Sequence, residues 1–418
     1  MDGLTPASPI PDRRDLGRRL IVASAAIGAL GPFGMHVLLP ALPSIAASLA
    51  VRASAAQLLV SLALVAIALG NLVIAPLSDR FGRRPVIMAG LWLFVAGSVA
   101  AAFAPSLPLL VAARVLQAFG AGAAMAVARA AIMDFFGPDR TAGALATTAT
   151  AVLVVPMFAP TLGGFAVEGL GWRAPFALAV ALGALVLWFT WARTAETHAA
   201  SPAAGPSPRT LASYRRLLGN GGYLAYVGFG GCMMGAVTAF ITSAPYVAIE
   251  VLGVSPSAYG LLFALPAGAA FAGFFFTSRM ALRLGGMRMM RMGVALSFAG
   301  GACLLAATLA GAAHPLSLFL PGMLICAGNA LAAPNSTSGA IASARDVAGA
   351  ASGMLGFFQL LVGAAATQLI AVVAAGSGLP LAATVAALNL GAVALVVHIG
   401  RRGALQGVAR PGDADTGL

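Results

Sequence analysis

Long apolar runs alternate with short polar segments along the whole chain. A helix of about 20 apolar residues is long enough to cross a lipid bilayer, and the sequence contains twelve runs of about this length. It therefore predicts twelve membrane-spanning helices, over residues 20–42, 56–77, 85–104, 107–132, 142–167, 174–192, 222–247, 257–280, 287–312, 315–342, 349–375 and 379–400.

The arginines indicate which side of the membrane each connection faces. The chain has no lysine, so its 24 basic residues are all arginines. If the N-terminus is cytoplasmic, the outer connections hold only Arg52 and Arg173, and the other arginines outside the spans lie on the inner side. Basic residues concentrate in the cytoplasmic connections of membrane proteins. The sequence therefore predicts an even number of spans with both termini in the cytoplasm.

Composition excludes several other classes of protein. With 60% hydrophobic and 9% charged residues, the chain has too few polar groups to cover a soluble domain. The lack of lysine excludes a Walker A loop, a Schiff-base lysine and a pyridoxal phosphate site. The net charge of +12 is spread in small groups between apolar runs, which indicates topology and not nucleic-acid binding. Cys232, Cys303 and Cys326 lie inside apolar runs, so neither a disulfide nor a metal site is expected.

A segment rich in proline and small polar residues divides the spans into two sets of six. It includes Ser201 to Pro208, and this composition predicts a flexible linker. Short sequences recur on its two sides at an offset near 200 residues, such as Arg80 to Gly82 and Arg283 to Gly285. We therefore expect a cytoplasmic N-terminal tail (1–19), a first six-helix bundle (20–192), a cytoplasmic linker (193–218), a second bundle (219–402) and a cytoplasmic C-terminal tail (403–418).

The connection between the second and third spans carries four charges in a short turn. Gly82 supplies the φ freedom of a tight turn between antiparallel helices, and Pro85 suits the first turn of the next helix. The second copy of this turn has Leu282 where the first has an acidic residue. Arginines at such a place are explained by topology alone, but the acidic residue is not. The charged residues are Asp79, Arg80, Arg83 and Arg84.

Arg114 lies well inside the fourth predicted span. An arginine there costs at least about 2.5–3.5 kcal/mol unless it faces protein or water. Gln117 follows on the same helical face. Two interpretations remain open: a structural arginine that binds backbone carbonyls, or part of a proton-coupling site.

The fifth predicted span contains two prolines and a pair of glycines. Pro156 and Pro160 each remove a backbone hydrogen bond, while Gly163 and Gly164 permit close contact with a neighbouring helix. Proline and glycine are also common in ordinary membrane helices. Taken alone, the segment therefore predicts a kinked span and no particular function.

Together these motifs resemble the signatures of the major facilitator superfamily. The matching residues include Asp79-Arg80-Phe81-Gly82-Arg83-Arg84, then Arg114-Val115-Leu116-Gln117, then Pro160-Thr161-Leu162-Gly163-Gly164. Their order, with Leu39-Pro40-Ala41-Leu42-Pro43 at the end of the first span, is similar to that of the Bcr/CflA-type drug–proton antiporters. The resemblance implies an all-α membrane protein of two pseudo-symmetric six-helix bundles.

The resemblance also implies a function and roles for particular residues. It implies a bacterial inner-membrane transporter that exports a small amphipathic compound or drug by alternating access, in exchange for protons. In the outward-open state, the charged turn would act as a gate between spans two and eleven. Arg114 and Gln117 would take part in proton coupling, and the fifth span would carry the antiporter motif of Pro156, Pro160, Gly163 and Gly164. A metabolite exporter, importer or facilitator of the same fold is the alternative. We expect no enzymatic activity, no cofactor besides the proton, no nucleic acid, and a monomer in the lipid bilayer.

His36 departs from the pattern of that group, which usually has an aspartate at this place in the first span. Counted from the span ends, His36 lies about 9 Å and Arg114 about 10 Å below the outer membrane face. Histidine alone has an unperturbed pKa in the physiological range. We therefore predict that His36 titrates during transport beside Arg114. The alternative is a neutral histidine bonded to a backbone carbonyl.

The substrate cavity is expected to contain no fixed anion. All Asp and Glu residues lie outside the spans or near their ends, which favours neutral or weakly anionic substrates, although aromatic contacts can also hold cations. We expect about half of the aromatic and amide residues in central positions to line the cavity. The candidates are Phe33, Phe240, Tyr246, Asn329, Asn335, Phe357, Phe358 and Gln359.

Overall fold

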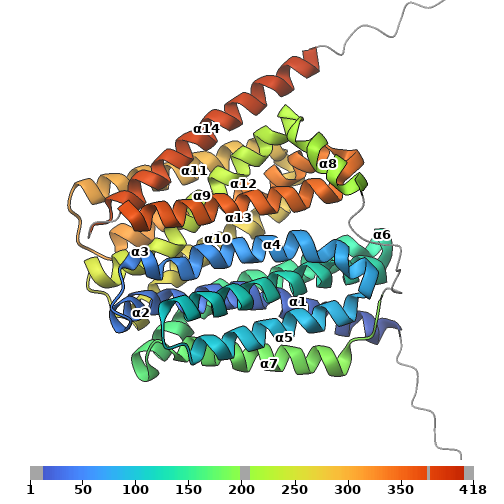
Figure 1. Cartoon of the computed structure of the whole chain (residues 1–418). Coiled ribbons are helices and arrows are strands. Elements are labelled where there is room, and N and C mark those ends of the chain that lie inside the picture. The colour runs from blue at the N-terminus through green and yellow to red at the C-terminus, as the bar shows by residue number, and fades with distance from the viewer. Residues whose placement is uncertain (1–12, 198–207, 374–376, 409–418) are drawn as a thin grey trace, which may run out of the picture.

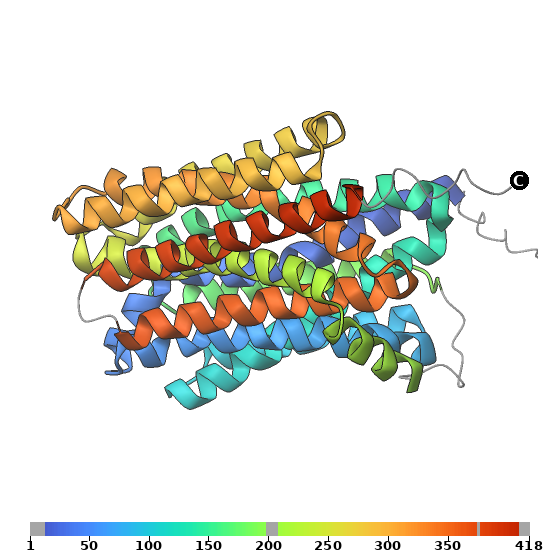
Figure 2. The ribbon, with the colours of Figure 1, turned by 90° about the horizontal axis from the view of Figure 1, so that it is seen from above.

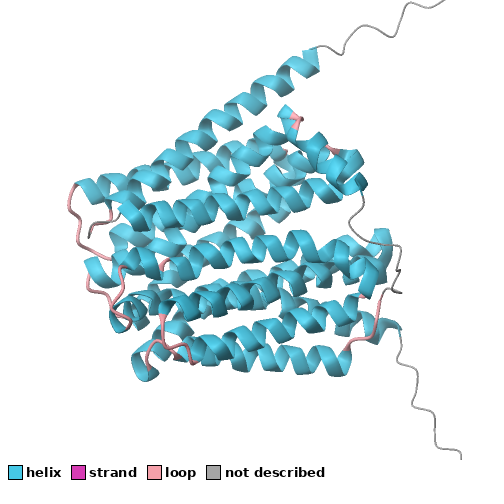
Figure 3. Cartoon of the chain, in the orientation of Figure 1, coloured by secondary structure: helices cyan, strands magenta, loops and turns pink. Residues whose placement is uncertain are grey.

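Long helices make up almost all of the chain. The computed structural model describes residues 13–197, 208–373 and 377–408, and this part of the chain contains helices and loops but no strand (Figure 3). The first half consists of α1 (Arg13–Leu38), η1 (Leu39–Ala41), α2 (Leu42–Ser48), α3 (Ala53–Ala56), α4 (Leu58–Phe81), α5 (Arg83–Ala102), α6 (Leu107–Leu170) and α7 (Ala174–Arg193). The second half consists of α8 (Pro208–Leu218), α9 (Gly221–Tyr246), η2 (Val247–Val251), α10 (Pro256–Leu284), α11 (Gly286–Leu309), α12 (Leu316–Ala342), η3 (Arg345–Val347), α13 (Ala348–Val373) and α14 (Leu379–Val408).

Within the described residues, twelve helical segments are long and apolar enough to cross a membrane. They correspond one to one with the twelve apolar runs of the sequence, so the predicted fold class is confirmed. The boundaries differ by a few residues at most ends, because helices continue beyond the apolar run into the polar surface.

The fourth and fifth spans join differently from the prediction. We expected a connection over residues 133–141, but α6 passes from one span into the other. Only Gly137, with φ 68° and ψ 178°, departs from helical dihedral angles inside it. Because glycine adopts positive φ at little cost, the chain reverses direction there with almost no loop.

The linker also contains a helix that its composition did not predict. Residues 198–207 lie outside the described residues, but Pro208–Leu218 forms α8. Leu217 is buried in an apolar cluster with Tyr223 and Leu355, and Arg216 pairs with Asp346 at 2.5 Å. Because one side of α8 packs on α9 and α13, tertiary contacts stabilise the helix and attach this part of the linker to the second half.

The helices form two bundles that lie side by side. In Figure 1, α1, α4, α5 and α7 lie below, and α9, α13 and α14 lie above; Figure 2 shows the same chain turned by 90°. We call the end where α1 begins and α14 ends the terminal end; the turns at Gly82 and Gly285 also lie there. The opposite end, where α1 and α9 finish, is the far end.

The two bundles repeat one another in detail at the turns after α4 and α10. Gly82 has φ 90° and ψ 157°, and Gly285 has φ 80° and ψ 146°. Each glycine N–H donates to the carbonyl oxygen four residues earlier at 2.9 Å, Ser78 in one turn and Ala281 in the other. Both turns need a residue that tolerates positive φ, which explains why the internal repeat retains glycine.

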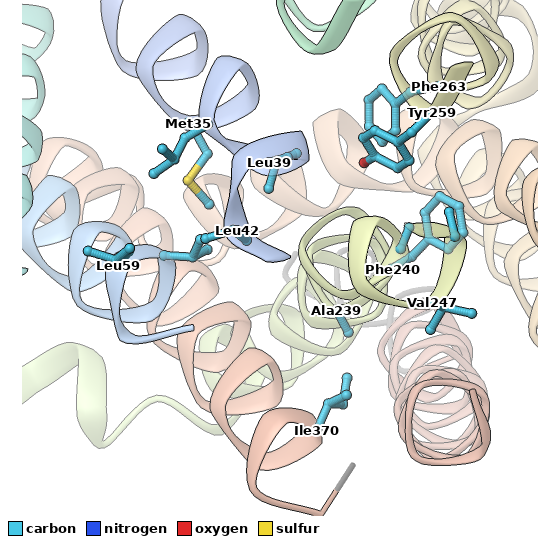
Figure 4. Packing of buried hydrophobic residues seen from close by; sticks show 14 of the residues in the cluster. Met35, Leu39, Leu42, Leu59, Ala239, Phe240, Val247, Tyr259, Phe263 and Ile370 are labelled. Atoms are coloured by element: carbon cyan, nitrogen blue, oxygen red, sulfur yellow. The ribbon is translucent and has the colours of Figure 1, made fainter. Parts of the chain in front are cut away.

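Apolar packing differs between the two ends. At the far end, one cluster of buried residues draws on both bundles; Figure 4 shows Met35 and Leu39 from the first bundle and Phe240 and Phe263 from the second. The other clusters of buried residues each belong to one bundle, and they include those nearest the terminal end. The bundles therefore share a core at the far end and have separate cores at the terminal end.

Candidate functional site

The charged turn between α4 and α5 forms a network inside the first bundle. Arg83 is only 7% exposed. Its guanidinium pairs with Asp79 at 2.5 Å and with Asp134 of α6 at 2.8 Å, and it also donates to the Ser78 hydroxyl. In this conformation these residues therefore bond within the first bundle, and the gate between α4 and α13, which was predicted for the outward-open state, stays a prediction.

Glu196, which follows α7, completes this network and was not predicted from the sequence. Its carboxylate accepts hydrogen bonds from the backbone N–H groups of Arg83 (3.0 Å) and Arg84 (3.1 Å). These N–H groups belong to the first turn of α5 and have no partner within the helix, and a negative charge there interacts favourably with the helix dipole. Arg84 in turn donates to the Trp191 carbonyl at 2.8 Å, whereas Arg80 is exposed over the ring of Phe81.

Arg114 is 3% exposed and belongs to a chain of hydrogen bonds between α6 and α5. Its guanidinium donates to Gln117 Oε1, Gln117 Nε2 donates to Ser98 Oγ at 2.6 Å, and Ser98 Oγ donates to the Phe94 carbonyl at 2.7 Å. The structure therefore brings Arg114 and Gln117 together. Ser98 was not predicted, because its proximity depends on how α5 packs against α6.

His36 and Arg114 lie on different sides of α1. Arg114 Nη1 lies 3.7 Å from the place where a Cβ on Gly34 would be, and His36 is about 200° further around the helix at 100° per residue. The imidazole of His36 has Nδ1 2.8 Å from the Pro32 carbonyl oxygen, and its ring centroid is 6.1 Å from that of Phe263 on α10. His36 thus faces the second bundle, while Arg114 faces the interior of the first.

The proline and glycine motif of α6 lies at contacts with two other helices. A Cβ on Gly163 would overlap the Val37 carbonyl oxygen of α1, and one on Gly164 would overlap the Pro256 carbonyl oxygen of α10. A Cβ on Gly260 would in turn lie 2.6 Å from the Pro160 carbonyl oxygen. Pro156 is partly exposed, and α6 remains helical through both prolines. This segment is therefore part of the interface between the bundles at the far end.

Five hydrogen bonds between described residues join the two bundles, and they all lie at or near the far end. Four of them involve serine, threonine or glutamine side chains, and the fifth is accepted by the Glu168 carboxylate. The donors and acceptors are Gln57 Nε2 to Thr242 O (3.0 Å), Ser61 Oγ to Gln368 Oε1 (3.1 Å), Gln368 Nε2 to Ser54 O (3.2 Å), Thr161 Oγ1 to Gly260 O (2.9 Å) and Ser257 N to Glu168 Oε1 (3.2 Å).

The predicted cavity residues divide into packed and partly exposed groups. Phe33 is buried in the core of the first bundle, and Phe240 is fully buried against Gly322 of α12, so in this conformation both serve packing. Tyr246 lines a pocket at the far end with Gln57 and Ser243. The remaining candidates, on α12 and α13, are partly exposed: Asn329, Asn335, Phe357, Phe358 and Gln359.

These features define a class of membrane protein. Two repeated bundles that are packed together at one end, and that hold polar groups within their own halves at the other, form the architecture of an alternating-access transporter. Residues 24–367 match the sequence profile of the Major Facilitator Superfamily. The chain belongs to this superfamily.

Individual relatives agree with this assignment. The chain is 30% identical over 350 residues to multidrug resistance protein D of Escherichia coli (strain K12), covering 83% of this chain and 87% of that protein. It is 30% identical over 384 residues to multidrug resistance protein MdtL of Shigella flexneri serotype 5b (strain 8401), covering 91% and 95%. Its fold matches a crystal structure of the peptide transporter POT in complex with sulfate, with TM-score 0.73 and 14% identity, over 94% of this chain and 99% of that one. The protein is therefore a multi-pass membrane transporter.

Proposed function

We propose that this transporter exports small amphipathic compounds from the cytoplasm in exchange for protons, with its terminal end in the cytoplasm. The relatives named as multidrug resistance proteins support export of such compounds. The arginine-rich connections at the terminal end support the orientation, because basic residues favour the cytoplasmic side.

The observation that carries the proposal is the difference in packing between the two ends. The bundles share a core and five hydrogen bonds toward the far end, while each bundle has its own cores toward the terminal end. Such an arrangement corresponds to one of the two states of an alternating-access cycle. In the proposed orientation, it is the state that receives substrate from the cytoplasm.

We assign proton coupling to His36; Arg114 and Gln117, which lie on another side of α1, form a separate polar group inside the first bundle. His36 is partly exposed and lies next to Met35 and Leu38, which belong to the shared core. Its ring contacts Phe263 of the other bundle. Protonation would therefore change the charge at the edge of the closed interface between the bundles.

Transport by the purified protein in proteoliposomes with an imposed pH gradient tests this proposal. A substrate is first selected by the resistance that the chain confers on a pump-deficient bacterial strain. We expect wild-type transport to require the gradient. We expect His36→Ala to lower gradient-driven transport at least tenfold, while exchange of labelled for unlabelled substrate, which needs no net proton movement, continues.

His398→Ala is the matched control, because His398 is exposed on α14 and away from the bundle interface. It should transport like the wild type. Gradient-driven transport that is the same in His36→Ala and the wild type would remove His36 from the coupling mechanism. Transport that does not respond to the gradient at all would contradict proton coupling itself.

A further inference from the structure

The transmembrane part of the chain contains two arginines far from the membrane surfaces and no acidic residue at such depth. All twelve Asp and Glu residues lie outside the candidate spans or within four residues of a span end. Arg114 is seven residues after Leu107, and Arg129 is eight residues before Gly137, in the same span. Eight residues of helix correspond to about 12 Å, so Arg129 lies well below the terminal-end surface.

Arg129 differs from Arg114 in its surroundings. Arg114 is buried and bonded to Gln117, whereas Arg129 is exposed. A charge exposed to lipid at this depth would be costly, so the direction in which Arg129 points decides what it can do.

The exposed apolar residues of α6 show that Arg129 points away from lipid. Gly120 packs on Gly90 of α5 and Gly122 packs on Ile67 of α4. The exposed residues Leu109 and Leu116 lie between these two packed faces and mark the lipid-facing side, whereas the exposed Met133, near the terminal end of the span, lies on the side of α4. At 100° per residue, Arg129 lies about 140° around the helix from Leu116 and about 160° from Leu109. It therefore faces the inside of the protein and borders open space there.

Asn71 of α4, which bonds Arg129, also faces the inside of the protein. Asn71 lies about 160° around α4 from the exposed residues Leu69 and Val73. The next residue, Leu72, reaches within 3.7 Å of the place where a Cβ on Gly353 of α13 would be. Asn71 is thus at the seam between the bundles, on the side where they have separate cores.

The guanidinium of Arg129 is held only loosely. Its Nη2 donates to Asn71 Oδ1 at 3.3 Å and its Nε to the Met125 carbonyl at 3.4 Å, both longer than the usual 2.7–3.2 Å. An arginine has five N–H donors, so three have no protein partner among the described residues. The nearby carboxylates Asp79 and Asp134 are already bonded to Arg83. Arg129 is thus a cation with free donors and no anionic partner in the described part of the bundle interface.

We propose that Arg129, positioned by Asn71, binds the anionic head of an amphipathic substrate in the space between the bundles that opens toward the terminal end. A guanidinium binds a carboxylate or sulfonate oxygen pair through two parallel hydrogen bonds, and low-dielectric walls strengthen the attraction. The substrate class is therefore monoanionic compounds with an apolar body. This inference rests on the proposed transport function, because it names the substrate that the transporter receives.

Three probes with the same ring test the charge preference: naphthalene-2-sulfonate, naphthalene-2-sulfonamide and 2-naphthyltrimethylammonium. The sulfonate is an anion at every working pH, so a pH gradient does not trap it as it traps a weak acid. Binding to the purified full-length protein in detergent is measured from the ligand-dependent shift of its unfolding temperature. We expect the wild type to bind the sulfonate at least tenfold more tightly than the other two probes.

The variant Arg129→Gln should lose that preference, with sulfonate binding at least tenfold weaker and sulfonamide binding unchanged. Arg129→Lys should retain part of the preference for the sulfonate, because lysine keeps the positive charge but cannot donate two parallel hydrogen bonds as a guanidinium does. Without ligand, both variants should unfold near the wild-type temperature, because Arg129 makes only two long hydrogen bonds.

The inference would be overturned if Arg129→Gln bound the sulfonate as tightly as the wild type does, or if its affinity for the sulfonate and for the sulfonamide fell by the same factor. It would also be overturned if the wild type bound the sulfonamide at least as tightly as the sulfonate. Because the assay needs no pH gradient, its result is independent of whether proton-driven export is found in proteoliposomes.

Discussion

The two ends of the bundle interface are built on different principles. At the far end, the bundles share one apolar core and five hydrogen bonds, and glycines on α6 and α10 bring backbones into contact. At the terminal end, the strongest interactions of Arg83 and Glu196 are with their own bundle. At the far end, complementary packing holds the two bundles together. At the terminal end, polar groups form hydrogen bonds and ion pairs within their own bundle.

This difference explains how one interface can open while the other is closed. Apart from Glu168, the groups that bond across the far end are uncharged, so the contact can separate with little change in charge pairing. Charged groups at the terminal end can change partners when the bundles approach, because part of their surface remains exposed: the side chain of Asp79 is 42% exposed and that of Asp134 is 25% exposed. Packing therefore holds the far end closed, while the charged groups of the terminal end pair within their own bundle.

The largest effect is expected from filling the far-end contact on α6. In Gly164→Leu, the side chain would overlap the Pro256 carbonyl oxygen, and overpacking of this kind costs about 1–3 kcal/mol or more. Because the cost applies only when the far end is closed, transport should fall at least tenfold. Spin-label distances between α6 and α10 should lengthen at the far end.

Gly169→Leu is the control, since it is on the same helix and nothing lies within 4 Å of its Cβ position. It should transport at close to the wild-type rate. If both variants lose transport equally, helix propensity and not the bundle contact is responsible.

A smaller effect is expected from removing the centre of the polar network at the terminal end. Arg83→Leu removes the ion pairs with Asp79 and Asp134, and hydrogen bonds to charged groups contribute about 1.5–3 kcal/mol each. With both carboxylates partly exposed, we expect the lower end of this range in the free energy of unfolding, seen as a reduced thermal unfolding temperature. Arg80→Leu should change stability by no more than about 0.5 kcal/mol, because Arg80 is exposed over Phe81. Equal losses in the two variants would contradict the assignment of Arg83 as the centre.

The smallest effect is expected from Gln368→Ala at the far end. The change removes two hydrogen bonds between the bundles, to Ser61 and to Ser54. Each contributes about 0.5 kcal/mol, the low end of the usual range, because water replaces it. The far end should open several-fold more often. This is measured as faster alkylation of the cysteine in Tyr246→Cys, made in a protein from which the three native cysteines have been removed. Thr308→Val, which removes only a hydrogen bond within α11, should leave the alkylation rate unchanged; an equal rise in both would refute the interpretation.

Features that depend on a single helix or turn could be predicted from the sequence. Twelve apolar runs predicted twelve spans, and the repeated glycine predicted matching turns at Gly82 and Gly285. Interacting pairs on one helix could also be predicted, such as Arg114 with Gln117 three residues later. Contacts between helices were not: Ser98, Glu196 and Asp134 lie far in sequence from the residues that they bond. The linker helix α8 was missed because its stability depends on packing against α9 and α13.

His36 and Arg114 show the limit most clearly. By itself, the sequence determined that both lie at similar depth in a membrane, because depth follows from counting residues along a helix. Only the tertiary structure decided that they face different neighbours, because the direction of a side chain in the bundle depends on how its helix is rotated against the others. For the same reason, only the structure distinguished Arg114, enclosed in the first bundle, from Arg129, which is exposed beside Asn71.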